Sequence, residues 1–148
     1  MDTPPAATWE VRHLIFTTIA ECGTAPDAAA IAATLPISPE TARDALTWLS
    51  DHAEIVIDPS GDVVMAHPFS NVETPFKVTI GDRSWWANCA WDTFGILAVL
   101  DADGTIHASY AEDGAPARIT IHAGVPAGTG VVHLLLPARE WTKDYVDT

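Results

Sequence analysis

The spacing of apolar residues changes once along this chain of 148 residues, and the change limits what the chain can fold into. Up to about residue 50, apolar side chains recur every three or four positions, as on one face of a helix. From residue 76 onward they tend to alternate with polar ones, as in half-buried strands. The sequence therefore predicts an α+β protein with two modules: a helical module over residues 1–70 and a β-rich module over residues 71–148.

The first module has the order of elements found in winged-helix domains. Helical spacing is seen in three stretches, at residues 11–19, 28–35 and 39–49. Ser38 and Pro39 supply the third stretch with an N-cap followed by proline at the first helical position. A β-hairpin is then predicted from residues 54–57 and 63–65.

Charge argues against DNA as the partner of this module. Arg43 is the only lysine or arginine between residues 38 and 66, and the whole chain has a net charge of −13. A helix that reads DNA brings cations to the phosphates, and an acidic protein is repelled by them at long range. We expect no nucleic-acid partner.

The second module is predicted to be a mostly antiparallel sheet with one helix. Residues 66–71 have the composition of a linker between the modules. Strands are predicted at residues 76–80, 83–87, 105–110, 117–122 and 130–137. The helix is expected to run from near Cys89 to Leu100, and residues 124–128 are expected to form a turn.

The most informative stretch is WANCAWDT, residues 86–93, at the start of that helix. Cys89 and Asp92 are three residues apart and would share one helix face. In a first helical turn the dipole and free N–H groups stabilise a thiolate and lower the pKa of the thiol. If neighbouring tryptophans exclude water, the carboxyl group would retain its proton and could deliver it. The bland interpretation is a buried cysteine beside a helix-capping aspartate.

The chain resembles the organomercurial lyase (alkylmercury lyase) family over most of its length. The family's active-site segment has the form aromatic–Ala–X–Cys–Ala–X–Asp–Thr, which residues 86–93 match, and the stretches DGAP (113–116) and PAG (126–128) are also similar. The resemblance implies that mercury is the substrate atom, with no organic cofactor. It implies that Cys89 is the first mercury-binding thiolate and Asp92 the proton shuttle, giving a hydrocarbon and Hg(II).

The pattern departs from the family at its second mercury-binding cysteine. Cys22 and Cys89 are the only cysteines, and the missing thiol would be expected just beyond Thr148. The chain is thus expected to be a fragment or a natural short variant. Cys22 is expected to be a core residue of the other module and a poor replacement. Two alternatives therefore stand beside the lyase: a non-catalytic protein that binds Hg(II) or another soft metal, and a winged-helix regulator with a lyase-derived sensor half.

Several further expectations follow. Trp86 and Trp91 are candidates to line a pocket for the organic group, with core packing as the other possibility. His107, His122 and His133 fall on predicted strands, but their spacing matches no zinc pattern, so exposed histidines are expected. The chain has neither a secretion signal nor about 18 consecutive apolar residues, which predicts a cytoplasmic protein off the membrane. The expected partners are a small organomercurial and a thiol protein that accepts mercuric ion, and the chain itself is expected to be a monomer or homodimer.

Overall fold

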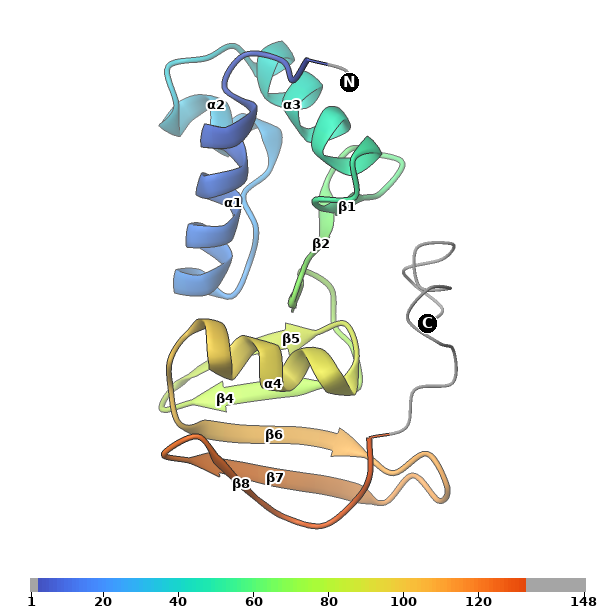
Figure 1. Cartoon of the computed structure of the whole chain (residues 1–148). Helices are drawn as coiled ribbons and strands as arrows, with labels where there is room; N and C mark the ends of the chain where they lie inside the picture. Colours follow the sequence, from blue (N-terminus) through green and yellow to red (C-terminus); the bar gives the residue numbers. More distant parts are fainter. Residues whose placement is uncertain (1–2, 133–148) are drawn as a thin grey trace. The chain divides into compact units, whose positions relative to one another are not determined.

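The computed structural model describes residues 3–132 of the chain (Figure 1). The chain divides into two compact units, residues 1–67 and residues 68–148. Helices dominate the first unit and antiparallel strands the second, so the α+β class predicted from the sequence is confirmed. In the described part of the chain, no helix combines the length and apolarity needed to cross a membrane.

The first unit contains three helices followed by a short hairpin. These are α1 (Thr8–Cys22), α2 (Ala28–Thr34), α3 (Pro39–Asp51), β1 (Val56–Ile57) and β2 (Val63–Ala66). Local chemistry explains where the helices begin and end. Gly23 closes α1 with a φ of 78°, which glycine adopts without steric cost. The side chain of Asp27 accepts a hydrogen bond from the backbone N–H of Ala30, and Ser38 caps α3 through the N–H of Thr41.

The hydrophobic core of this unit is fully enclosed. Its buried members are 0–3% exposed and come from all three helices and the hairpin: Val11, Ile15, Ile31, Ala42, Ala45, Leu46, Leu49, Ile55, Val63 and Ala66. The apolar positions that predicted the helices are therefore the ones that pack together. Arg12 lies outside this core and pairs with Glu54, with 2.8 Å between Nε and Oε2.

The second unit contains an antiparallel sheet and one helix. Its described strands are β3 (Phe69–Ser70), β4 (Lys77–Ile80), β5 (Arg83–Ala87), β6 (Gly104–Ser109), β7 (Pro116–His122) and β8 (Val125–Ala127), and the helix is α4 (Ala90–Val99). Within this unit the strands lie in the order β3-β5-β4-β6-β7-β8. Each neighbouring pair is antiparallel.

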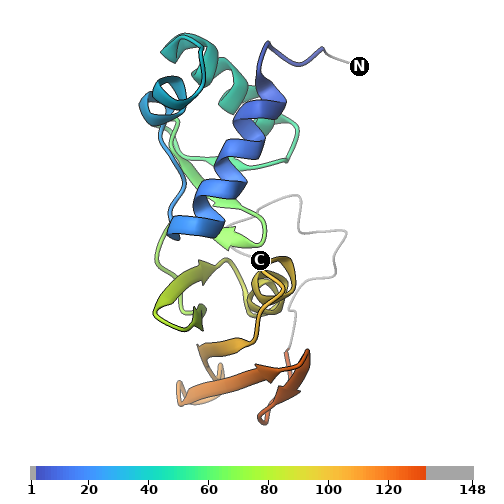
Figure 2. The same cartoon turned by 90° about the vertical axis from the view of Figure 1, so that its left-hand side faces the viewer.

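Helix α4 lies across one face of this sheet, over β4 and β5 (Figures 1 and 2). Trp85, Val78 and Ile106 are direct neighbours on three adjacent strands, and all three are buried on that face. Ile96 and Leu97 are the buried aliphatic residues of the helix. The alternation along each strand places the next residues on the opposite, more polar face.

Gly104 allows close packing between α4 and the sheet. A Cβ atom at this position would lie 2.7 Å from Cδ2 of Leu97 and 2.7 Å from the backbone oxygen of Thr79. Both distances are too short for real contacts, so only glycine fits here without a shift. This crowding comes from partners distant in sequence, so local sequence patterns do not predict it.

Two expectations about loops were wrong. The predicted linker at residues 66–71 contains β3, in which Phe69 and Ser70 are buried and pair with Ala87 and Trp86. A two-residue strand is too short to show alternation, so periodicity could not reveal it. The predicted turn at residues 124–128 contains β8, which pairs with β7. Most of the strand predicted at residues 130–137 lies outside the described residues.

Candidate thiol–carboxylate site

The candidate site lies where β5 passes into α4. The end of β5 is held by three hydrogen bonds around Ala87. Its N–H donates to the oxygen of Phe76 at 2.9 Å, and its oxygen accepts from the hydroxyl of Thr74 at 2.6 Å. The N–H of Phe76 in turn donates to that hydroxyl at 3.2 Å. The residues that follow Ala87 therefore start from a fixed point on the sheet.

Cys89 is the N-cap residue of α4, and its backbone is extended, with φ −142° and ψ 175°. Asp92 is the acidic residue of the first helical turn. The thiol of Cys89 donates a hydrogen bond to Oδ2 of Asp92, with 3.4 Å between sulfur and oxygen. Both side chains are half-buried. The structure thus brings together the two residues singled out from the sequence, and the sulfur is neither sealed in the core nor turned away from the carboxyl group.

The thiol differs from expectation in its acidity. The sequence predicts a lowered pKa for Cys89, but its pKa is raised, mainly because burial disfavours the thiolate. The negative charge of Asp92 and the hydrogen bond to its carboxylate raise the pKa further. The backbone N–H groups of Asp92 and Trp91 act in the opposite direction without outweighing burial. At rest the site is therefore a neutral thiol hydrogen-bonded to a carboxylate.

The three tryptophans near the pair point in different directions. Trp85 is buried in the sheet, on the face that α4 covers. Trp86 faces the other way, and the ammonium group of Lys77 lies 5.0 Å from its ring centre. Trp91 is 58% exposed, with its ring 6.3 Å from that of Phe94. The three rings therefore do not form one shared wall around Asp92.

A described cavity of about 380 Å³ lies between the second half of α4 and the β7–β8 hairpin. Its lining is mostly apolar and includes Phe94, Leu97, Ile121 and Pro126. Neither Trp86 nor Trp91 lines this cavity, so their assignment to a pocket stays a prediction.

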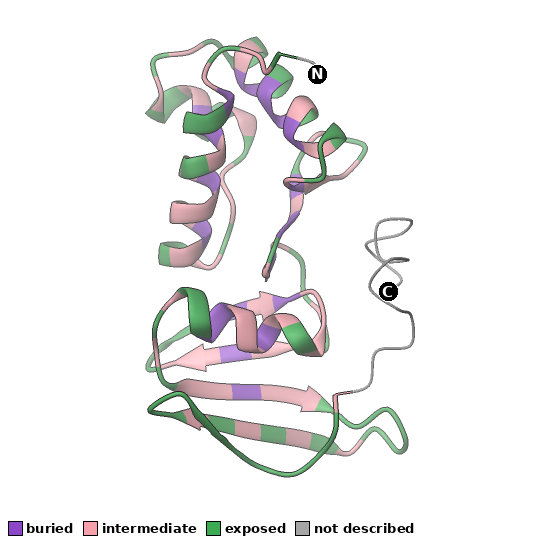
Figure 3. Ribbon diagram, viewed as in Figure 1, coloured by how far each residue is buried: buried purple, intermediate pink, exposed green. Residues whose placement is uncertain are grey.

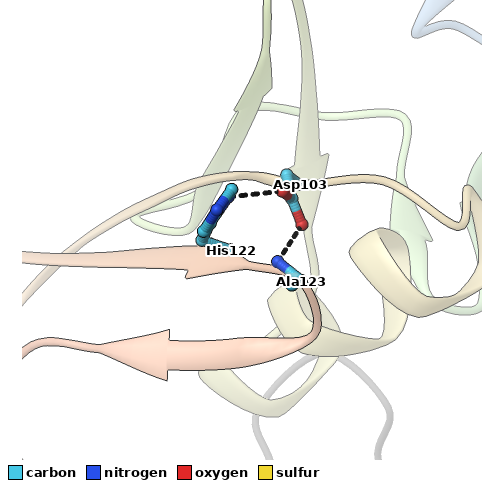
Figure 4. A network of polar contacts seen from close by, with 3 residues as sticks. All are labelled: Asp103, His122 and Ala123. Atoms are coloured by element: carbon cyan, nitrogen blue, oxygen red, sulfur yellow. Dashed lines mark hydrogen bonds and ion pairs between the residues drawn. The ribbon is translucent and has the colours of Figure 1, made fainter.

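Two of the predicted strand histidines, His107 and His122, form side-chain hydrogen bonds on or beside the sheet. Nε2 of His107 is 3.0 Å from the hydroxyl of Thr79. Nδ1 of His122 is 2.8 Å from Oδ2 of Asp103, whose other oxygen accepts a 2.7 Å hydrogen bond from the N–H of Ala123 (Figure 4). His133 lies outside the described residues. Over residues 3–132, no group of three or more His, Cys, Asp or Glu side chains is arranged to hold a metal ion.

Three further residues bear on the site: Cys22, Thr93 and Thr74. Cys22 ends α1 in the other unit and is exposed, so the expectation that it packs in the core was wrong. Thr93 is fully buried, and its hydroxyl donates to the oxygen of Ala90 at 2.6 Å. This hydrogen bond lies in the helical turn that carries Asp92. The role of Thr74 was missed because its partner Ala87 lies 13 residues away.

The fold and this site define a class of protein: an α+β chain with a protonated thiol and a carboxylate in contact at the N-terminus of a helix that packs on an antiparallel sheet. The model of one family, MerB, described as alkylmercury lyase, matches residues 69–148. That is more than half of the chain and includes α4 with its thiol and carboxylate, and the chain belongs to this family.

A solved structure supports the assignment. The chain is similar to the crystal structure of the mercury-bound form of MerB2, with a TM-score of 0.67 and 26% sequence identity. The match covers 84% of this chain and 60% of that one, so this chain spans less than two thirds of its solved relative. No curated protein matches the chain.

Proposed function

We propose that this chain is an organomercurial lyase-like protein that cleaves carbon–mercury bonds, with Cys89 as the mercury-binding thiolate and Asp92 as the proton shuttle. The observation that carries the proposal is the 3.4 Å contact between the sulfur and the carboxylate at the start of α4. Membership of the alkylmercury lyase family supports it, and so does the likeness to a relative whose crystal structure holds mercury.

The first step is capture of the organomercurial cation. A thiolate is a soft ligand suited to a soft metal, whereas the resting thiol is protonated. As sulfur bonds to mercury, the S–H bond breaks and the proton passes to Oδ2 of Asp92, the acceptor already in place. The product of this step is a sulfur–mercury–carbon adduct beside a neutral carboxylic acid.

The second step is protonolysis. The carbon–mercury bond breaks heterolytically, its electron pair stays on carbon, and Asp92 returns the proton to that carbon. A hydrocarbon leaves, Hg(II) stays on the sulfur, and the carboxylate is regenerated. No electron is transferred and no organic cofactor is needed. The bound Hg(II) would then pass to a thiol protein, in a cytoplasm that keeps such thiols reduced.

A second candidate function is capture of Hg(II) or another soft metal without turnover. It is favoured by the single thiol that contacts Asp92 among the described residues. One thiolate and one carboxylate would hold mercury more weakly and activate the carbon–mercury bond less than two thiolates. The two functions differ only in whether a hydrocarbon is released.

The test separates capture from cleavage in a Cys22→Ser background, which removes an exposed competing thiol. With phenylmercury as the substrate, mass spectrometry of the adduct reports capture and headspace analysis reports benzene. Cys89→Ser should lose both readouts. Asp92→Asn should keep the adduct and release benzene roughly 10² to 10⁴ times more slowly, as expected on loss of a general acid.

The possible results distinguish the lyase from the metal-binding alternative. Capture without benzene in the Cys22→Ser parent would replace the lyase with the metal-binding alternative. Benzene release by Asp92→Asn at the parent's rate would remove Asp92 from the mechanism. Retention of the adduct by Cys89→Ser would overturn both proposals.

A further inference from the structure

The polar face of the sheet, opposite α4, carries a straight row of two cationic side chains with an imidazole between them. Lys77 on β4 pairs directly with His107 on β6, and His107 pairs directly with Arg118 on β7. Trp86 extends the row on β5, where it pairs with Lys77 and lies beneath its ammonium group. We call Lys77, His107 and Arg118 the cationic row.

The cationic row is not neutralised within the described part of its unit. Described strands β3 to β8 contain no aspartate or glutamate at all. Neither Lys77 nor Arg118 forms an ion pair with a carboxylate among residues 3–132. Lys77 and Arg118 are both positive and stand on either side of His107, so the row attracts an incoming anionic group.

The pKa of His107 reflects the positive charges on either side of it. Its pKa is lowered, first by burial and then by the positive charges of Arg118 and Lys77. The three groups therefore act on one another. In a chain with net charge −13, a positive surface of this kind is the exception.

A complementary surface exists on α3 of the same protein. Glu40, Asp44 and Asp51 are four and seven residues apart, so they lie on one side of the helix, and all three are exposed. We call them the acidic stripe. Asp44 and Asp51 are seven residues apart, which is about 10 Å along a helix axis. Lys77 and Arg118 are two strand spacings apart, also about 10 Å.

We propose that the cationic row binds the acidic stripe on α3 of a second copy of this chain. The match of sign and spacing places Asp44 and Asp51 opposite Arg118 and Lys77. Because the two surfaces are different, the contact is head-to-tail, and a dimer keeps a free stripe on one copy and a free row on the other. Association therefore extends beyond the dimer as the concentration rises.

The ionic strength determines whether the two copies associate. Two copies that each carry −13 repel at long range in dilute buffer. At about 0.1 M salt the screening length is roughly 10 Å, which weakens that repulsion more than pairs in contact. Exposed ion pairs are individually weak, so we expect association only at protein concentrations on the order of 1 mM or above. Salt at about 1 M should abolish it.

Sedimentation velocity with two complementary variants tests the proposal. Lys77→Gln/Arg118→Gln destroys the row and keeps the stripe, whereas Asp44→Asn/Asp51→Asn destroys the stripe and keeps the row. Each variant alone should remain monomeric. Mixed in equal amounts they retain one working contact per pair, so they should form a dimer and nothing larger. The wild-type chain should instead grow past the dimer.

A matched control removes the effect of net charge. Glu21→Gln/Glu112→Gln changes the charge as much as the helix variant does, at exposed sites outside both surfaces. It should associate like the wild type or slightly better. A wild-type chain that stays monomeric at 0.1 M salt, or a mixture of the two complementary variants that fails to dimerise, would overturn the proposal. Neither outcome bears on the proposed function, because neither surface contains Cys89 or Asp92.

Discussion

The two units differ in how completely they close around their apolar residues. In the first unit, the core residues from three helices and the hairpin are almost entirely enclosed. In the second, burial fades across the sheet, as Figure 3 shows. Val78, Trp85 and Ile106 are buried, β7 alternates between exposed and half-buried residues, and all of β8 is exposed. The comparison teaches that, within the second unit, tight packing is limited to the part of the sheet under α4, the helix whose N-terminus carries Cys89 and Asp92.

The largest expected effect comes from the enclosed core. Leu46→Ala removes a side chain that is 1% exposed and leaves a cavity that rigid neighbours cannot fill. We expect the free energy of unfolding of the first unit to fall by about 2–5 kcal/mol. The decrease in the free energy of unfolding is measured by urea titration, with hydrogen exchange of the amides in α1 and α3 as the probe.

The matched change in the open part of the sheet is Ile121→Ala on β7. Its side chain is half-buried and borders the cavity beside α4, so less apolar surface returns to water. We expect a loss of about 1 kcal/mol or less. Equal losses for Leu46→Ala and Ile121→Ala would break the contrast between the units.

An intermediate effect is expected where the second unit is tightly closed. Gly104→Ala places a Cβ atom 2.7 Å from the backbone oxygen of Thr79, which cannot move without shifting β4. Overpacking of this kind costs about 1–3 kcal/mol. Thermal unfolding measures the loss. Gly114→Ala is the control, because a Cβ atom at that turn glycine meets no neighbour and strains only its positive φ. A Gly104→Ala variant as stable as the wild type would mean that α4 packs loosely.

The smallest effect concerns the thiol itself. Because the charge and hydrogen bond of Asp92 raise the pKa of Cys89, Asp92→Asn should lower that pKa, although burial still raises it. At neutral pH the thiolate fraction, and with it the rate of alkylation by iodoacetamide, should rise several-fold, since one pKa unit is about tenfold. The rate is measured against pH in the Cys22→Ser background. Slower alkylation of Asp92→Asn would contradict the electrostatic account.

The raised pKa also fixes the pH dependence of stability. Above the usual pKa of a thiol, an unfolded chain loses the Cys89 proton while the folded chain keeps it. The folded state then binds more protons, so the stability contributed by this group is present at neutral pH and lost as pH rises through the folded pKa. His107 acts at the other end of the scale. Its pKa is lowered, so stability falls as pH drops below the usual histidine range.

Local signals predicted the helices and much of the sheet. Ser38 and Pro39 placed the start of α3, and alternation placed β4, β5 and β7 within a residue of their observed bounds. The sequence failed where pairing decides the structure. Neither β3 nor β8 is long enough to alternate, and each exists because a neighbouring strand offers hydrogen bonds.

The candidate site shows the same division. The spacing of Cys89 and Asp92 predicted their contact, because three residues in a first helical turn determine it locally. The direction of the thiol's pKa shift depends on burial, which comes from packing against the sheet and was predicted wrongly. The cationic row was invisible in the sequence, since Lys77, His107 and Arg118 are about 30 and 11 residues apart and meet only through strand register.

The double contact of Asp103 has a consequence for how this family member can vary in length. One carboxylate holds both the ring of His122 and the backbone of Ala123, where the chain reverses between β7 and β8. An insertion in the connection after α4, or in the hairpin, would move Asp103 away from His122 and Ala123 and break both contacts at once. Natural or engineered insertions should therefore be accommodated more easily in the exposed turn at residues 111–114, which has no such tie to a distant loop among the described residues.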